Sequence, residues 1–219
     1  MEHTKYVSAV LVAVATTLFA SSTLAVDGVV LIDQNKALAG NVTPGDTAGF
    51  PVTISQPGSY RLSSNLTVPS GQSAITITVP NVTIDLNGFS ITTTVQPSPG
   101  GAVSINYSGT VPPRHISIAN GFIDGFVTID LFSQDIRCQF CTLENLTFRW
   151  GAPASSAGLG LGNFARIHRV TASSHFISVK CPSVVTNSVA LNFGQAIPFP
   201  GDPIPNQGTC TFAHNATFQ

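Results

Sequence analysis

Charged residues are scarce in this sequence. Asp, Glu, Lys and Arg make up 9% of its residues, whereas an ordinary soluble domain has roughly 25%. The net charge is −1, and no basic run or stripe occurs. Proteins that bind nucleic acids or anionic membranes concentrate Lys and Arg on one surface. The composition therefore argues against both partners, and a surface rich in Thr, Ser and Asn is compatible with neutral or weakly acidic glycans.

Long apolar runs are also lacking, except near the start of the chain. Residues 6–20 form an apolar run of about fifteen residues, shorter than the roughly twenty that span a bilayer. Lys5 precedes this run, and Thr23-Leu24-Ala25 supplies small residues before a cleavage point. We interpret residues 1–25 as a secretory signal peptide cleaved after Ala25; the alternative is a membrane anchor. We therefore expect a secreted, periplasmic or extracellular protein with no membrane span after cleavage.

The clearest pattern lies between Ser73 and Thr94, where three short runs alternate apolar with polar residues. The turns Pro80-Asn81 and Asn87-Gly88 separate these runs. The apolar positions are Ile75, Ile77, Val82, Ile84, Leu86, Phe89 and Ile91. A period of two, built from Ile, Val and Thr, predicts strands with one buried face. The turns are too tight for crossover helices, so the three strands predict one coil of a solenoid.

The same arrangement recurs toward the C-terminus, with loops of variable length. Asn falls at the corresponding turn in four predicted coils, at Asn87, Asn120, Asn145 and Asn187. Asn tolerates the left-handed backbone of a sharp corner, and stacked Asn side chains can hydrogen-bond to one another. We therefore predict an all-β fold, a single-stranded parallel β-helix of about five to six coils. Alternation alone also permits an antiparallel sandwich.

The predicted domain organisation has two parts after the signal peptide. Residues 26–58 are interpreted as an N-terminal cap, because the first coil of a solenoid would otherwise expose unpaired strand edges. Residues 59–219 are interpreted as the β-helix, ending in a Pro-rich loop and a closing strand.

The segment AITITVPNVTIDLNGFSI resembles the coils of secreted right-handed parallel β-helix proteins, the pectin-lyase-like superfamily. The preceding GFPVTISQPGSYRLSSNLTVPSG resembles the lead-in of bacterial members of that group. The resemblance is close over residues 49–94 and is limited to the strand pattern over residues 100–193. It implies right-handed winding and a fold that hosts lyases, hydrolases, adhesins and proteins with no known activity.

The cysteine content is small and even, which in an exported chain predicts disulfides. Cys138 and Cys141 have the spacing of a redox motif, but nothing around them resembles a strand followed by a helix. We predict a structural staple there, with a metal half-site or a redox role as alternatives. Cys181 and Cys210 fall on strands that, if stacked, lie roughly 4.8 Å apart, within reach of a disulfide.

Candidate catalytic residues come from the outward positions of the first strand in each coil, the usual groove of the superfamily. This face carries one acid and one base, Asp130 and Lys180. The Asp-Asp, His-Gly and Arg-x-Lys signatures of pectin-degrading relatives are missing. Calcium requires six to eight oxygen ligands, and the sequence does not assemble them locally. We therefore expect no cofactor, with calcium retained only for a lyase.

Candidate binding residues come from the outward positions of the second strand. They are Asp85, Glu144, Arg166 and His168. The two carboxylates would lie two coils apart, roughly 10 Å at the usual strand spacing, and the basic residues could hold an acidic sugar. Trp150 follows the third coil at a Gly-Ala-Pro loop, where it could stack on a sugar ring or seal the core.

Two hypotheses about function follow. The first is an exported, non-catalytic β-helix that presents a Thr/Ser/Asn-rich face to a glycan or another surface component. The second is a polysaccharide lyase or glycoside hydrolase with a sparse site, built from Asp130 and Lys180 or from Asp85, Glu144 and His168. Glycoside hydrolysis requires two carboxylates facing one gap, and no predicted strand bears a pair or trio of acids, so the first hypothesis is favoured.

Overall fold

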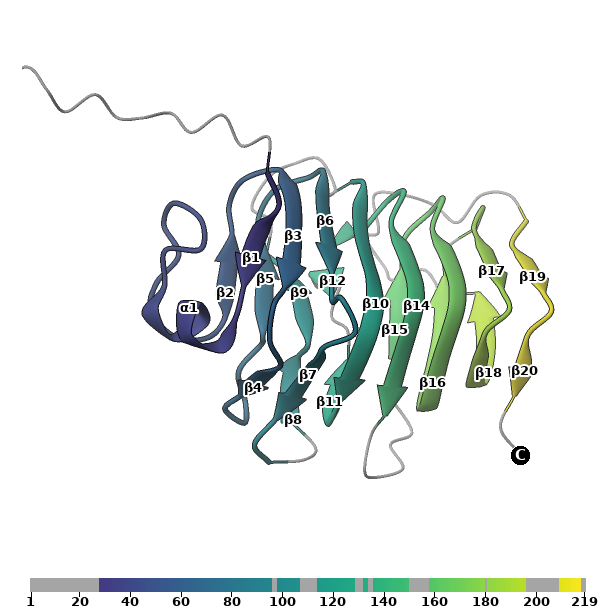
Figure 1. Ribbon diagram of the computed structural model, residues 1–219. Helices are drawn as coiled ribbons and strands as arrows, with labels where there is room; N and C mark the ends of the chain where they lie inside the picture. The colour runs from purple at the N-terminus through teal and green to yellow at the C-terminus, as the bar shows by residue number, and fades with distance from the viewer. Residues whose placement is uncertain are drawn as a thin grey trace, which may run out of the picture.

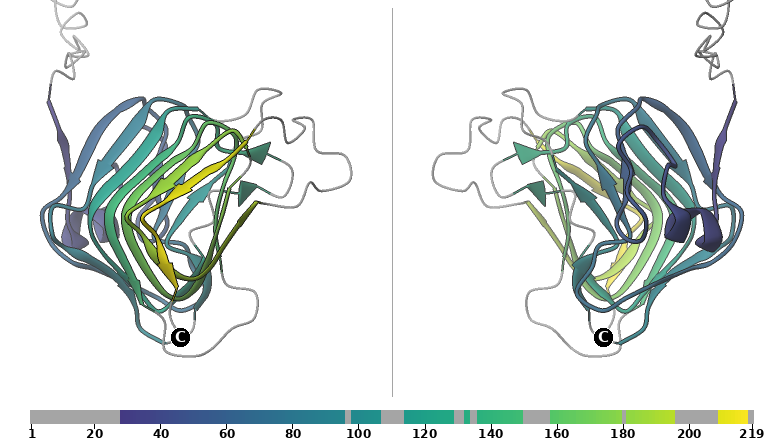
Figure 2. Two further views of the ribbon diagram at one scale, coloured as in Figure 1. Left: turned by 90° about the vertical axis from the view of Figure 1, so that its right-hand side faces the viewer. Right: turned by 90° about the vertical axis from the view of Figure 1, so that its left-hand side faces the viewer.

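Parallel strands stacked along one axis dominate the computed structural model (Figure 1). It describes residues 28–95, 98–106, 114–128, 132–133, 136–149, 158–179, 181–195 and 209–217. Seen along the stack, the strands of successive turns of the chain lie one behind another around a shared interior (Figure 2). The all-β, parallel fold is confirmed, and the arrangement is consistent with a β-helix-like solenoid. No helix among the described residues is long and apolar enough to cross a membrane.

The main ladder is the longest series of paired strands, and every pairing in it is parallel. Its members, in spatial order, are β1 (Val30–Ile32), β3 (Gly58–Leu62), β6 (Val82–Asp85), β10 (Ile116–Asp124), β14 (Thr142–Arg149), β16 (Arg166–Val179), β17 (Val184–Thr186) and β19 (Thr211–Ala213). Figure 1 shows them side by side from β1 to β19.

A second ladder uses the later parts of β10, β14 and β16, and it is also parallel. Its other members are β4 (Leu66–Val68), β7 (Ser90–Thr93), β18 (Val189–Gln195) and β20 (Ala216–Thr217).

Shorter ladders complete the described strands. Parallel pairing joins β2 (Val52–Ile54), β5 (Ile75–Ile77) and β9 (Val103–Ile105), joins β8 (Ser98–Gly101) to β11 (Phe126–Thr128), and joins β15 (Gly158–Leu161) to the end of β16. The exception is antiparallel: β12 (Phe132–Ser133) with β13 (Ile136–Arg137).

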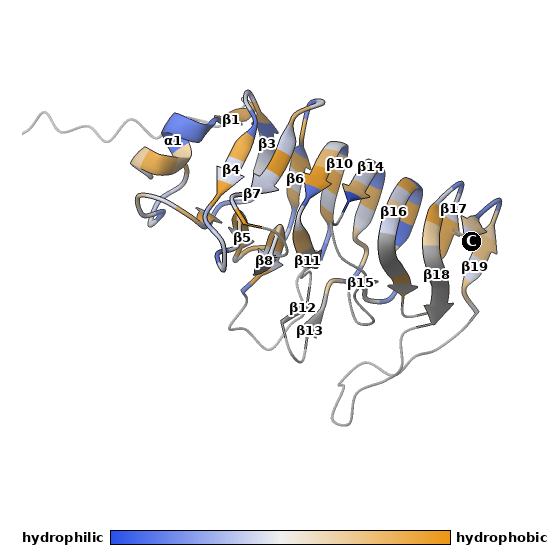
Figure 3. Ribbon diagram, turned by 90° about the horizontal axis from the view of Figure 1, so that it is seen from below, coloured by the Kyte–Doolittle hydropathy of each residue, from blue (hydrophilic) through white to orange (hydrophobic). Residues whose placement is uncertain are grey.

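The core consists of the inward-pointing residues of the ladders. One inward row of the main ladder is in register across its strands: Tyr60, Ile84, Ile118, Leu143, Ile167 and Val185, all buried. Alternation of apolar and polar residues along each strand produces this row, and Figure 3 shows the resulting bands of hydropathy. Because burying such a side chain contributes about 1.5–3 kcal/mol, these rows hold the coils together.

The predicted Asn corner is confirmed. Asn87, Asn120, Asn145 and Asn187 all have positive φ, between 51° and 64°. The side chains also hydrogen-bond across coils, since Asn145 Nδ2 donates to Asn120 Oδ1 at 3.1 Å. Register places Arg169 at the same corner between Asn145 and Asn187, and His214 after Asn187, and both have positive φ as well. We call these residues the Asn corner.

The N-terminal end of the stack carries helix α1 (Gln34–Ala39) (Figure 1). Asp33 caps it, because its Oδ1 accepts a hydrogen bond from Lys36 N at 2.8 Å. The loop after the helix is tied to the strands by the buried Asp46, whose carboxylate accepts hydrogen bonds from Val42 N and Thr53 N at 3.0 and 2.7 Å.

The structure differs from the sequence prediction in how the strands are divided. Strands predicted to end at Asn120 and Asn145 continue through those residues as β10 and β14, because a single residue with positive φ bends a strand and leaves the pairing on both sides intact. The predicted cap also takes part in the repeat, since β1 pairs with β3 and β2 pairs with β5.

The first strands predicted to share one face are divided among several ladders in the described residues. Thr76 pairs with Ser104 in the β5–β9 ladder, whereas Gly160 pairs with Ser178 in the β15–β16 ladder. Thr128 belongs to a third pairing, between β11 and β8. Alternation reports which way a side chain points, but it does not report which strand is the neighbour.

Candidate functional site

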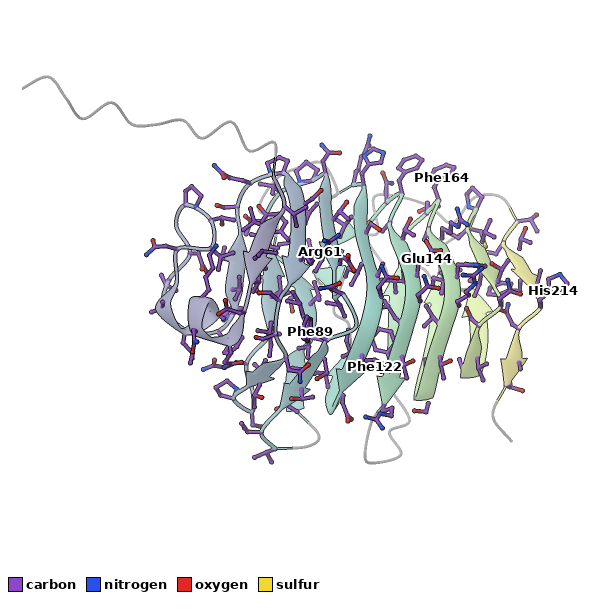
Figure 4. All side chains as sticks on the ribbon, in the orientation of Figure 1. Arg61, Phe89, Phe122, Glu144, Phe164 and His214 are labelled. Carbon is purple, nitrogen blue, oxygen red and sulfur yellow. A yellow bond between two sulfur atoms is a disulfide. The ribbon has the colours of Figure 1, made fainter. Side chains whose placement is uncertain are left out.

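The outward side of the main ladder forms one continuous surface between two corners, which we call the polar face. Two rows of side chains run across it in register. The first row is Ser59, Thr83, Ser117, Thr142, Arg166 and Val184, and the second is Arg61, Asp85, Ala119, Glu144, His168 and Thr186. Figure 4 shows the outward side chains of this surface, with Arg61 and Glu144 labelled along it. The prediction that Asp85, Glu144, Arg166 and His168 share one face agrees with this register.

Asp85 is engaged in holding the fold. Its carboxylate accepts hydrogen bonds from Arg61 Nε at 3.1 Å, from Asn120 Nδ2 at 3.1 Å and from Asn87 N at 2.9 Å. Partial burial acts to raise the pKa of Asp85, but these hydrogen bonds and the Arg61 charge outweigh it and lower the pKa. Asp85 is therefore a poor proton donor, and it terminates the hydrogen-bonded row of the Asn corner.

Glu144 is placed differently. It lies directly beside His168 on the next strand, and Arg166 lies two residues earlier on that strand, so all three side chains point outward together. His168 Nδ1 is 2.8 Å from Thr186 Oγ1. Among the described residues, no hydrogen bond or ion pair holds the Glu144 carboxylate. This group of three can bind hydroxyls or charged substituents of a ligand on the polar face.

The two carboxylates of the polar face are not equivalent partners. Asp85 and Glu144 are two strands apart, separated by Ala119, which corresponds to roughly 10 Å. An inverting glycosidase places its carboxyl groups about 6.5–9.5 Å apart and requires one to hold a proton and the other to activate water. Because Asp85 already accepts three hydrogen bonds and has a lowered pKa, it is poorly suited to the role that holds the proton.

The remaining predicted site residues have different outcomes. Asp130, Lys180 and Trp150 lie outside the described residues. Within the ranges that the structure covers, no group of three or more His, Cys, Asp or Glu side chains could hold a metal ion.

Both predicted disulfides are present. Cys138 pairs with Cys141 at a Cα–Cα distance of 5.9 Å, and Cys181 pairs with Cys210 at 4.9 Å. The second bond ties the segment after β16 to the residue before β19. Disulfides are typical of proteins in oxidising compartments, and these two serve as staples of the coil.

A row of aromatic side chains borders the polar face at the corner opposite the Asn corner, and the sequence interpretation missed it. His115, Phe140 and Phe164 occupy equivalent positions just before β10, β14 and β16. We call these three residues the aromatic ridge. Their rings stack, with centroids 5.3 Å apart for His115 and Phe140 and 4.7 Å apart for Phe140 and Phe164.

The backbone of the aromatic ridge is left-handed. His115, Phe140 and Phe164 have φ of 56°, 53° and 59°, as does Asn81 (60°) at the same corner one coil earlier. The rings are exposed, 41% for Phe140 and 51% for Phe164. A signal for the ridge exists in the sequence, since each residue stands two positions before an outward Ser, Thr or Arg. Its recognition requires the strand register.

Comparison of this chain with protein-family models, with curated proteins and with solved structures found no match. What the chain does must therefore be inferred from the polar face, its two corners and the chemistry of their side chains.

Proposed function

We propose that this chain is an exported, non-catalytic right-handed parallel β-helix of the pectin-lyase-like type, whose polar face binds a glycan or another cell-surface component. In this proposal residues 1–25 are a signal peptide removed after Ala25. The coil has about five to six turns. Right-handed winding is favoured because parallel crossover connections are right-handed in about 98% of cases. The two disulfides support export, because such bonds persist in oxidising compartments.

The observation that carries the proposal is the in-register stacking of outward polar side chains. Ser59, Thr83, Ser117 and Thr142 present a hydroxyl at the same position in four successive strands. Adjacent strands lie about 4.8 Å apart, so the hydroxyls repeat at a constant short interval. A linear polymer of sugars also repeats hydroxyls along its length, and a regular row of donors and acceptors matches such a ligand better than a single small molecule.

The charges of the polar face fit binding better than turnover. Asp85 is held ionised by Arg61 and the Asn corner, whereas catalysis by a carboxylate pair needs one group that keeps its proton. Glu144, Arg166 and His168 supply a small mixed-charge spot beside the hydroxyl row. Trp150 belongs to the proposal as an aromatic that would stack on a sugar.

A polysaccharide lyase or glycoside hydrolase remains the second candidate. It is favoured by a local concentration of titratable groups, Glu144 with Arg166 and His168, and by the outward Asp130 and Lys180 predicted from the sequence. A lyase of this kind would use Lys180 to abstract a proton, with calcium as a possible cofactor.

The test is one panel of neutral and acidic polysaccharides, used first for binding and then for turnover. Retention of the protein by affinity electrophoresis on at least one polysaccharide, with no new reducing ends and no ultraviolet absorbance from unsaturated uronates, is the expected result. Loss of retention in the Thr83→Ala/Thr142→Ala variant would place binding on the polar face. Turnover that disappears in the Asp130→Ala/Lys180→Ala variant would overturn the proposal in favour of an enzyme.

A further inference from the structure

The aromatic ridge has more exposed apolar surface than its structural role needs. The same left-handed corner is filled by Asn81 one coil earlier, and the opposite corner uses Asn in four coils. Asn accepts positive φ readily, whereas a bulky residue there is an outlier that costs free energy. Stacking of two rings returns only part of that cost. Backbone geometry alone therefore favours Asn at positions 140 and 164, and the rings require another reason.

The rings form a terraced surface. Phe140 and Phe164 are nearly parallel, at 4°, with centroids 4.7 Å apart. Carbon atoms of stacked rings make contact at about 3.5–4.0 Å, so the larger centroid distance means that one ring is displaced sideways relative to the other. Each ring consequently leaves part of a face uncovered, in agreement with the exposure of both residues. Figure 4 shows Phe164 at the end of the strands, beyond Glu144 on the polar face.

Hydroxyl groups run parallel to this apolar surface. Ser117 and Thr142 follow His115 and Phe140 by two residues, point outward and are in register with each other. A ligand lying along the stack would therefore meet aromatic rings on one side and hydroxyls on the other. Pyranose rings have this double character, with C–H groups on the ring faces and hydroxyls around the edge.

The ring faces favour a neutral polymer. Aromatic faces carry the negative end of the ring quadrupole, which attracts C–H groups and repels carboxylates. Glu144 lies two residues beyond Thr142 on the same side of the strand, and Arg166 lies beside Thr142 on the next strand, so charges of both signs border the row and give an acidic chain no net attraction. Sugars whose ring substituents are all equatorial have the least interrupted C–H faces, so they fit the terraces best.

We propose that the aromatic ridge and the Ser117–Thr142 hydroxyls form a binding site for a neutral, β-linked pyranose polymer that runs along the stack. This site deepens the proposed function and rests on it, since it names where on the molecule the glycan makes its apolar contacts. The disulfide between Cys138 and Cys141 spans Phe140.

The test is titration calorimetry of the full chain with cellohexaose and xylohexaose. The Phe140→Asn/Phe164→Asn variant removes the rings and keeps a residue suited to positive φ. Aromatic contacts of the usual strength predict a three- to tenfold loss of affinity per ring, roughly tenfold or more for the pair. The matched control is Phe122→Thr, which removes an equally exposed ring (45%) from the second ladder and should leave affinity unchanged. Binding should also be insensitive to salt, because no ion pair is involved.

The outcomes separate the site from the general function. Unchanged affinity in the double variant, or salt-sensitive binding of oligogalacturonate in place of the neutral chains, would overturn the ridge and leave a glycan-binding polar face standing. Failure to bind any oligosaccharide would overturn both. If the double variant does not fold, saturation-transfer NMR on the native chain replaces it: transfer from the Phe ring protons to sugar C–H protons is expected, and its absence contradicts the site.

Discussion

The two corners that border the polar face share a left-handed backbone but carry different side chains. Both are lined by residues with positive φ in successive coils. At the Asn corner the side chains form hydrogen bonds along the stack, from Asn145 to Asn120 and on to Asp85. At the other corner, rings stack on one another and stand in solvent, while disulfides lie beside them at Cys138–Cys141 and Cys181–Cys210.

This difference indicates that the Asn corner stabilises the coil, whereas the aromatic ridge is available to bind a ligand. In four coils the Asn corner uses Asn, which suits a left-handed backbone, and Asn145 and Asn120 are used in hydrogen bonds within the protein. The aromatic ridge uses residues that suit a left-handed backbone poorly and leaves Phe140 and Phe164 exposed, so that their rings can contact a ligand. Removing one side chain should therefore affect stability at the first corner and binding at the second.

The largest effect on stability is expected from the disulfide next to the aromatic corner. The Cys181→Ser/Cys210→Ser variant should lose roughly 3.5 kcal/mol of unfolding free energy, because the bond closes a loop of about thirty residues in the unfolded chain. Urea denaturation measures the loss. The Cys138→Ser/Cys141→Ser variant, whose cysteines are separated by 3 residues, should lose less. Equal losses would contradict the loop-length account.

The next largest effect is expected at the Asn corner. Asn120→Ala removes hydrogen bonds with Asp85 and Asn145 and puts a Cβ-bearing residue without a polar side chain at φ 64°. These two losses together should lower the unfolding free energy by about 2 kcal/mol. Asn120→Gly should recover the backbone part, leaving a loss of about 1 kcal/mol. If the Gly variant is as unstable as the Ala variant, the left-handed backbone is not what selects Asn.

A smaller effect is expected for the same kind of experiment at the aromatic ridge. Phe164→Asn loses one ring contact but gains a residue that tolerates its φ of 59°, so the unfolding free energy should change by less than about 1 kcal/mol. Thermal unfolding measures the change. A loss of several kcal/mol would mean that the ring belongs to the core, and the contrast between the two corners would fail.

The smallest effect is the pH dependence contributed by Asp85. Its pKa is lower in the folded chain than in the unfolded chain, so its stabilising contribution is complete above the unfolded pKa and is lost as the pH falls through the folded pKa. The native chain should therefore lose its stability advantage over Asp85→Asn below about pH 4. Denaturation midpoints at pH 7 and pH 3 check this, and an advantage that does not change with pH would contradict it.

What could be predicted from the sequence was the part that local residues specify. Alternating Ile and Val between residues 75 and 91 defined strands, and Asn87, Asn120, Asn145 and Asn187 defined a corner, because each residue type carries its own backbone preference. The outward grouping of Glu144 with His168 followed from the same alternation. The pairing of Cys181 with Cys210 followed from stacking of their strands.

What could not be predicted depended on register across coils. Phe140 sits inside a Cys-x-x-Cys segment and Phe164 follows Asn163, so neither has a local pattern that indicates an exposed corner. Their alignment with His115 appears only when β10, β14 and β16 are placed in register. The separate ladders of the first strands have the same cause, since loops of unequal length decide which strands become neighbours.

The central claim is that the aromatic ridge binds the ligand and the Asn corner stabilises the coil. Backbone amide NMR of the full chain during titration with cellohexaose tests this claim most directly. The account predicts chemical-shift changes at His115, Phe140 and Phe164 and along Ser117 and Thr142. It predicts none at Asn120 and Asn187. Shifts centred on the Asn corner, or a spectrum that no sugar perturbs, would contradict it.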